Sequence, residues 1–170
     1  MVTLLLMRHG ETPDNVSHIM QGQTQGRLND RGIRQAEEVR DKLSARHLDA
    51  VVSSDLQRAV TTAQIVAQPH RLNVVTTPLL RERDWGDFTG CFIPSLQGKP
   101  LPVNVESIDC LLERAQRFLD YIQQEYDGMT VLAVGHGIIN KAIQAVARQC
   151  TMREVQKMTN AEIRTLTLDK

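Results

Sequence analysis

Two of the five histidines, His9 and His136, lie at the ends of apolar segments of the chain, and each has a glycine beside it. A neutral imidazole can attack phosphorus and become a phosphohistidine. Guanidinium groups match the oxygens of a phosphate dianion, and Arg8 and Arg58 are candidates for that role. These residue types predict phosphoryl transfer through histidine, in which catalysis consists mainly of positioning the phosphoryl group and offsetting its charge.

A leaving alkoxide needs a proton, which a carboxylic acid can supply. Glu82, which lies between Arg81 and Arg83, is the candidate acid. Its local spacing does not prove this role, because a solvated glutamate between two arginines has the same sequence.

Strands that alternate with helices must position these side chains. Strands are expected at residues 2–7, 50–52, 74–75, 130–134 and, at a sheet edge, 163–168. Helices are expected at about 30–46, 56–67, 108–126 and 138–149, with Asn29 capping the first and residues 53–55 capping the second. This order predicts a three-layer α/β/α sandwich with a mostly parallel sheet and an antiparallel edge strand. Ligands bind beyond the carboxyl ends of such strands, where both histidines are expected.

Bulk properties favour one soluble domain spanning residues 1–170. The chain is 41% hydrophobic and 24% charged with no formal net charge, which does not favour a nucleic-acid or membrane partner. No signal peptide or membrane-spanning run is recognisable, so we expect a cytoplasmic protein. The three cysteines form no metal-like pair and are expected to be reduced. Neither a metal nor another cofactor is expected, and both a monomer and a homodimer are compatible with the sequence.

Over nearly its whole length the sequence resembles the histidine phosphatase superfamily, also called phosphoglycerate mutase-like. The matching motifs are Arg-His-Gly-Glu-Thr at residues 8–12 with Asn15, Gly-Gln at 22–23, Ser-Ser-Asp-Leu-Gln-Arg-Ala at 53–59, Leu-Arg-Glu at 80–82 with Gly86 and Gly90, and Val-Gly-His-Gly at 134–137. One such motif is weak, but four in family order are very specific.

The resemblance implies a role for each matching residue. His9 is expected to be the nucleophile and Glu82 the proton donor, while Arg8, Arg58 and His136 hold the phosphoryl group. The other expected substrate contacts are Asn15, Gln21, Gly22, Arg81 and Gly137. Gly10 is expected to clear space for the phosphate.

Some positions leave alternatives open. Gln25 and Arg27 stand where many relatives carry Asp and Pro, which puts local substrate contacts in doubt. Arg83, together with Arg81, either favours a second acidic group on the substrate or faces solvent. Trp85 is either a wall of the pocket or a core residue.

The segment between Gly90 and the long helix is short, whereas family mutases commonly carry larger insertions there. A short lid leaves a phosphohistidine open to water. The expected function is therefore metal-independent hydrolysis of small-molecule phosphomonoesters through a phosphohistidine on His9. The alternatives are a phosphoglycerate mutase-type phosphoryl transferase, a protein phosphohistidine phosphatase and a catalytically inactive phosphate-binding module.

Overall fold

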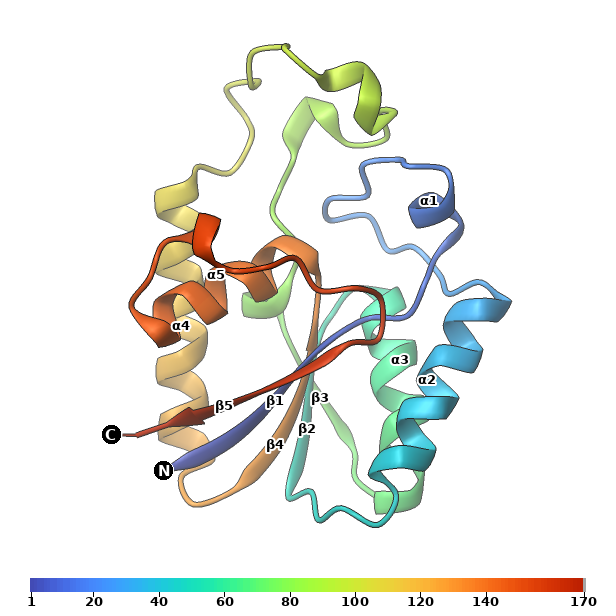
Figure 1. The fold of residues 1–170 in the computed structure, drawn as a ribbon, viewed down its shortest axis with the longest axis vertical. Helices are drawn as coiled ribbons and strands as arrows, with labels where there is room; N and C mark the ends of the chain where they lie inside the picture. Colours follow the sequence, from blue (N-terminus) through green and yellow to red (C-terminus); the bar gives the residue numbers. More distant parts are fainter. Residues whose placement is uncertain (170) are drawn as a thin grey trace.

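The computed structural model describes residues 1–169 as three layers, with a five-stranded sheet between two pairs of helices (Figure 1). The strands are β1 (Val2–Arg8), β2 (Ala50–Ser54), β3 (Val74–Thr77), β4 (Thr130–Gly135) and β5 (Ile163–Leu168), in the spatial order β3-β2-β4-β1-β5. Only the pairing of β5 with β1 is antiparallel among the described strands. The predicted fold class and its antiparallel edge strand are thus confirmed.

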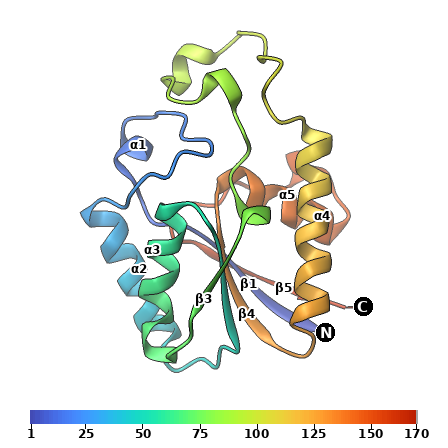
Figure 2. The same cartoon turned by 180° about the vertical axis from the view of Figure 1, so that it is seen from behind.

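Both faces of the sheet are covered by helices (Figures 1 and 2). The helices α2 (Asp30–Leu43) and α3 (Gln57–Ala67) pack on one face, and α4 (Ile108–Glu125) and α5 (Gly137–Arg148) pack on the other. Along β1, Leu4 and Leu6 belong to the α4/α5 core and Leu5 and Met7 to the α2/α3 core. A strand buried on both faces needs no polar alternation, which explains its continuous apolar sequence.

The remaining helices are short. They are α1 (Pro13–Val16) and the 3₁₀ turns Gln68–His70, Pro78–Leu80, Gly86–Phe88, Ile93–Leu96 and Met152–Glu154. None of the helices in residues 1–169 is both long enough and apolar enough to cross a membrane.

The helix start after β2 differs from the prediction. Leu56 is the N-cap residue of α3 and makes no side-chain cap, while Gln25 Oε1, from a distant segment, accepts from the Gln57 amide at 3.0 Å. Ser54 Oγ instead accepts a hydrogen bond from the Leu56 amide at 3.2 Å, and Ser53 Oγ donates to the Ser54 carbonyl. Residues 53–55 therefore do not cap α3, because β2 continues to Ser54 and leaves only a tight turn. Asn29 does cap α2, since its Oδ1 accepts from the Gly32 amide at 2.8 Å.

Residues 81–107, which we call the lid, lie over the carboxyl ends of the strands (Figure 1). This segment is irregular, with no helix longer than four residues. The lid is joined to the segment after α1 by backbone hydrogen bonds: Met20 N donates to Cys91 O at 2.9 Å, and Gly90 N donates to Met20 O at 2.7 Å. An antiparallel bridge between Ile19 and Phe92 completes this contact. The two segments together roof the end of the sheet.

Candidate active site

The pairing of β1 with β4 brings the two glycine-flanked histidines together. Arg8 lies opposite Gly135 in the parallel register, so the residues that follow, His9 and His136, are neighbours. Their ring centroids are 5.1 Å apart, with an interplanar angle of 60°. Both side chains are buried, at 3% and 0% exposure respectively. The sheet thus fixes two imidazoles at a single point beyond the strand ends.

His9 is held in one tautomer. Its Nδ1 lies 2.7 Å from the carbonyl oxygen of Gly10, and a carbonyl can only accept, so Nδ1 carries the hydrogen. Burial, followed by the nearby charges of Arg58 and Arg8, holds the pKa of His9 well below its usual value. The ring is therefore neutral at neutral pH, with a lone pair on Nε2, which is the form that can attack an electrophile.

His136 is held in the same Nδ1–H tautomer, but here Nε2 is the bonded nitrogen and Nδ1 is the free one. Its Nε2 lies 2.8 Å from Ser54 Oγ, which already accepts from the Leu56 amide. We therefore assign the hydroxyl hydrogen of Ser54 to Nε2, which places the hydrogen of His136 on Nδ1. Burial first, then the charge of Arg58, keeps the pKa of His136 well below its usual value. Its Nδ1 is buried and has no partner among the described residues, so it is a donor in need of an acceptor.

Two guanidinium groups flank the histidines, that of Arg58 buried and that of Arg8 half-buried. Arg58, in the first turn of α3, is 1% exposed and donates to the carbonyls of Gly22, Thr24 and Gln25. Arg8 donates to the Met158 carbonyl at 2.6 Å. Burial lowers the pKa of Arg58 to about 10, so it remains charged at neutral pH.

Neither of these arginines has an ion-pair partner within residues 1–169. The Nε atoms of Arg8 and Arg58 are also buried without a hydrogen-bond partner. Two cations without an ion pair, each with a free buried Nε donor, favour a bound anion.

Glu82 reaches the same place from the lid. Its carboxylate accepts hydrogen bonds from the amides of Ile138 and Ile139 at 3.1–3.2 Å and of Arg83 at 2.8 Å. Two of these amides belong to the first turn of α5, where His136 supplies no side-chain cap. Glu82 thus satisfies free N–H groups at the positive end of that helix. Its carboxylate is thus held at the residues two and three positions after His136.

These groups surround a cavity of about 440 Å³. Eight of the expected site residues line it: Arg8, His9, Asn15, Gln21, Gly22, Arg58, Glu82 and Gly137. The cavity is also lined by apolar side chains, those of Ile19, Met20, Trp85 and Ile93 from the two segments above the sheet and that of Ile138 from α5. The arrangement offers a cationic base with a nucleophile for a phosphoryl group, under a less polar compartment for the rest of a small ligand.

Within residues 1–169 no group of three or more His, Cys, Asp or Glu side chains is arranged to hold a metal ion. The positive charge at the cavity base comes from Arg8 and Arg58.

The comparison with protein families decides among the readings of this geometry. The family model described as histidine phosphatase superfamily (branch 1) matches residues 4–170. The chain belongs to this superfamily. Among its relatives is the phosphoglycerate mutase-like protein 4 of Arabidopsis thaliana, 33% identical over 94% of this chain and 76% of the relative. The metal-independent phosphoserine phosphatase of the same plant is 31% identical over 94% of this chain and 74% of the relative.

The solved structure of Bacillus stearothermophilus YhfR has the same fold, with a TM-score of 0.92. It is 27% identical and covers 99% of this chain and 92% of its own. The phosphoserine phosphatase of Entamoeba histolytica with 3-phosphoglyceric acid bound gives a TM-score of 0.84 at 28% identity, covering 97% and 90%. As a member of this family with phosphatase relatives, the chain is a phosphoric monoester hydrolase.

Two expected members of the site do not line the cavity of this histidine phosphatase. Arg81 does not line the cavity, because its guanidinium forms a bidentate ion pair with Asp55 at 2.6–2.7 Å. His136 does not line it either; it is fully buried beside His9.

Two further expectations are corrected by packing. Arg83 does not face solvent: it is 7% exposed, its Nε donates to the Glu106 carbonyl, and its guanidinium lies 4.5 Å from the centroid of the Trp85 ring. Gly10 does not serve to clear space for a ligand. A Cβ at Gly10 would lie 2.5 Å from the Gly32 carbonyl oxygen, so its missing side chain lets β1 approach the start of α2.

Four polar cavity residues were missed by reasoning from the sequence: Asp14, His18, Lys157 and Asn160. Asn160 donates to the carbonyl of His9 at 3.2 Å and to Asn15 Oδ1 at 3.1 Å, and so ties the loop before β5 to the nucleophile. Lys157 adds a cation to the wall, and burial lowers its pKa. Neither residue belongs to a motif, and no local pattern marks it. His18 is exposed but also borders the cavity.

Proposed function

We propose that this phosphatase hydrolyses small-molecule phosphomonoesters without a metal ion, through a phosphohistidine formed on His9. One observation carries the proposal: Arg8 Nε, Arg58 Nε and His136 Nδ1 are buried donors without acceptors, beside one nucleophilic imidazole. A phosphoryl group carries acceptor oxygens and negative charge, which suit these donors. The relative named a metal-independent phosphoserine phosphatase supports the same assignment.

In the proposed first step, Nε2 of His9 attacks phosphorus in line while the bond to the ester oxygen breaks. Glu82, as the carboxylic acid, gives its proton to the leaving oxygen. The hydrogen on His9 Nδ1 stays bonded to the Gly10 carbonyl, which stabilises the cationic phosphoimidazole.

In the second step, water attacks the phosphohistidine and the P–N bond breaks. Glu82, now a carboxylate, accepts the proton of this water, and inorganic phosphate leaves. The free enzyme is restored with neutral His9 and protonated Glu82.

Hydrolysis is favoured over transfer by the lid. Its longest helix has four residues, so it provides no large element that excludes water from the cavity. The cavity volume of about 440 Å³ fits a small molecule better than a protein side chain presented on a surface.

The test is phosphate release from a panel of small phosphomonoesters, measured with a chelator present and with His9→Gln in parallel. Release that survives chelation and disappears in the variant is the expected result. Acid-labile phosphate trapped on the wild-type protein during turnover should also disappear in His9→Gln. Chelator-sensitive release, or a His9→Gln variant with wild-type activity, would overturn the mechanism. Isomerised substrate without released phosphate would instead identify a mutase.

A further inference from the structure

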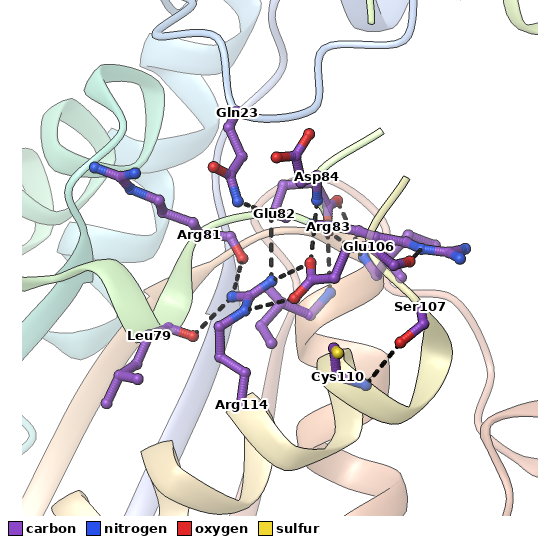
Figure 3. A network of polar contacts seen from close by, with 12 residues as sticks. Gln23, Leu79, Arg81, Glu82, Arg83, Asp84, Glu106, Ser107, Cys110 and Arg114 are labelled. Carbon is purple, nitrogen blue, oxygen red and sulfur yellow. Dashed lines mark hydrogen bonds and ion pairs between the residues drawn. The ribbon is translucent and has the colours of Figure 1, made fainter. Parts of the chain in front are cut away.

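The segment that carries Glu82 has no regular secondary structure of its own. Residues 81–85 follow the 3₁₀ turn Pro78–Leu80 and precede the turn Gly86–Phe88. The backbone of such a segment is not held by the hydrogen bonds of a helix or a sheet, so other groups must fix its position. Figure 3 shows that most of these groups come from α4 and the residues just before it, and that Gln23 Nε2 also donates to the Glu82 carbonyl, at 3.1 Å.

Arg114 of α4 forms hydrogen bonds with the backbone of Glu82 and of the residues before it. Its Nη1 donates to the carbonyls of Leu79 and Arg81 at 3.0 and 2.6 Å, and its Nη2 donates to the carbonyl of Glu82 at 3.4 Å. Its Nε and Nη2 also donate to the two carboxylate oxygens of Glu106, at 3.0 and 2.8 Å. These five hydrogen bonds match the five N–H groups of a guanidinium, so the side chain has no donor left for another role.

Glu106 forms hydrogen bonds with the residues that follow Glu82. Its amide donates to the Asp84 carbonyl at 2.8 Å, and its Oε1 accepts from the Asp84 amide at 3.1 Å. Its own carbonyl accepts from Arg83 Nε at 2.8 Å. Glu82 is thus bracketed by two residues that are paired with each other, each with a side chain only 14% exposed.

From these contacts we propose that the Arg114–Glu106 ion pair is the device that positions Glu82 for proton transfer. This inference rests on the proposed role of Glu82. Arg114 and Glu106 do not line the cavity and act only through the backbone they hold. The carboxylate of Glu82 is then directed to the first turn of α5, where the amides of Ile138 and Ile139 receive it. Two helices of one layer, α4 and α5, therefore set the position of the acid together.

Lysine cannot replace Arg114 here, because an ammonium group has three donors and no planar fork. Arg114→Lys leaves carbonyls of the segment without donors and loosens the segment. A displacement of about 1 Å of a catalytic group can lower the rate of its step about 100-fold. Because the loss acts on proton donation, it should depend on how much the leaving group needs a proton.

The experiment measures kcat/KM for an alkyl phosphate, glycerol phosphate, and for p-nitrophenyl phosphate, whose leaving group needs little protonation. Since kcat/KM reports steps up to the first irreversible one, it isolates cleavage of the ester. For Arg114→Lys we expect a loss of about 10- to 100-fold on the alkyl substrate and less than about 3-fold on the aryl substrate. Glu106→Gln, which keeps the size of the side chain, should show the same selectivity.

A matched control is Arg164→Lys. Arg164 also binds a carboxylate and backbone carbonyls, but it lies on β5 and holds residues 156–157 and Glu162 instead of the lid. Its substitution should leave the ratio of alkyl to aryl activity unchanged, even if the protein is destabilised to a similar extent. Urea unfolding of each variant gives that comparison.

The decisive arm repeats Arg114→Lys in a Glu82→Gln background. A residue that acts through Glu82 should cost less than about 2-fold there, because the acid is already gone. An undiminished loss in that background, or equal losses on both substrates, would overturn the proposal. If Glu82→Gln alone shows no preference for alkyl over aryl losses, the failure lies with the proposed acid itself, and the positioning role falls with it.

Discussion

Both site histidines should make the free enzyme sensitive to acid. The structure buries His9 and His136 at 3% and 0% exposure, and desolvation followed by the charge of Arg58 lowers both pKa values well below 6.5. In the unfolded chain each imidazole returns to a pKa of about 6.5. Below that pH the two imidazoles bind protons in the unfolded state but not in the folded state. Their contribution to stability is therefore complete above about pH 6.5 and is lost as the pH falls.

The magnitude follows from linkage. For each pH unit below 6.5, a histidine that stays neutral in the folded state lowers the unfolding free energy by up to about 1.4 kcal/mol. Integrated from pH 7 to pH 5, this is about 2 kcal/mol for each histidine and about 4 kcal/mol for the pair. Domains of this size typically have a total stability of about 5–15 kcal/mol, so the effect is a large part of it.

The assay is urea unfolding at pH 7 and pH 5 for the wild type, His9→Gln and the double variant with His136→Gln. Carboxylates also contribute to acid sensitivity, but they are common to all three proteins and cancel in the comparison. The loss between the two pH values should shrink by about 2 kcal/mol in the single variant and about 4 kcal/mol in the double variant. The control, His18→Gln, removes an exposed imidazole and should leave the loss unchanged. An identical loss in every protein would show that His9 and His136 are not held neutral by the fold.

Three further predictions concern single side chains. Glu82→Gln should reduce kcat/KM about 100-fold or more for alkyl phosphates and much less for aryl phosphates, and equal reductions would remove it from the acid role. Ser54→Ala should lower kcat/KM about 10-fold on both substrates alike, because the Nδ1–H tautomer of His136 loses its support; a change in the alkyl-to-aryl ratio would contradict this. Gly32→Ala should destabilise the protein by about 2–4 kcal/mol in urea unfolding, because the added Cβ would lie 2.1 Å from the Glu11 carbonyl oxygen, and a wild-type midpoint would refute the clash.

The sheet and the charged base of the site follow from patterns that are local in the sequence. Continuous apolar runs predict strands buried on both faces, and strand–helix alternation predicts a parallel order. In such a sheet the residues after each strand must meet at one edge, which is why His9, His136 and Arg58 were identified before the structure.

Partners of charged residues outside the motifs were not predictable in the same way. Arg81 pairs with Asp55, which is 26 residues away, and Arg114 binds Glu106 and a turn more than thirty residues upstream. No local sequence feature distinguishes Arg81 from a residue that binds substrate, because the direction of its side chain depends on where β2 ends relative to β3. Lys157 enters the cavity for a comparable reason, since its loop is placed by the pairing of β5 with β1.

His9 and His136 have different chemical roles because each ring is hydrogen-bonded to a different neighbour. A carbonyl, that of Gly10, fixes the hydrogen of His9 on Nδ1 and leaves Nε2 free to attack. A hydroxyl, that of Ser54, occupies Nε2 of His136 and leaves Nδ1–H as a donor. Burial first, and then the charges of Arg8 and Arg58, lower the pKa of both rings. The same arginines suit a phosphate dianion, so a bound substrate offsets their charge. In the proposed mechanism, binding therefore raises the pKa of His9 at the point where its ring must become cationic, and the same guanidinium groups serve the free and the phosphorylated enzyme.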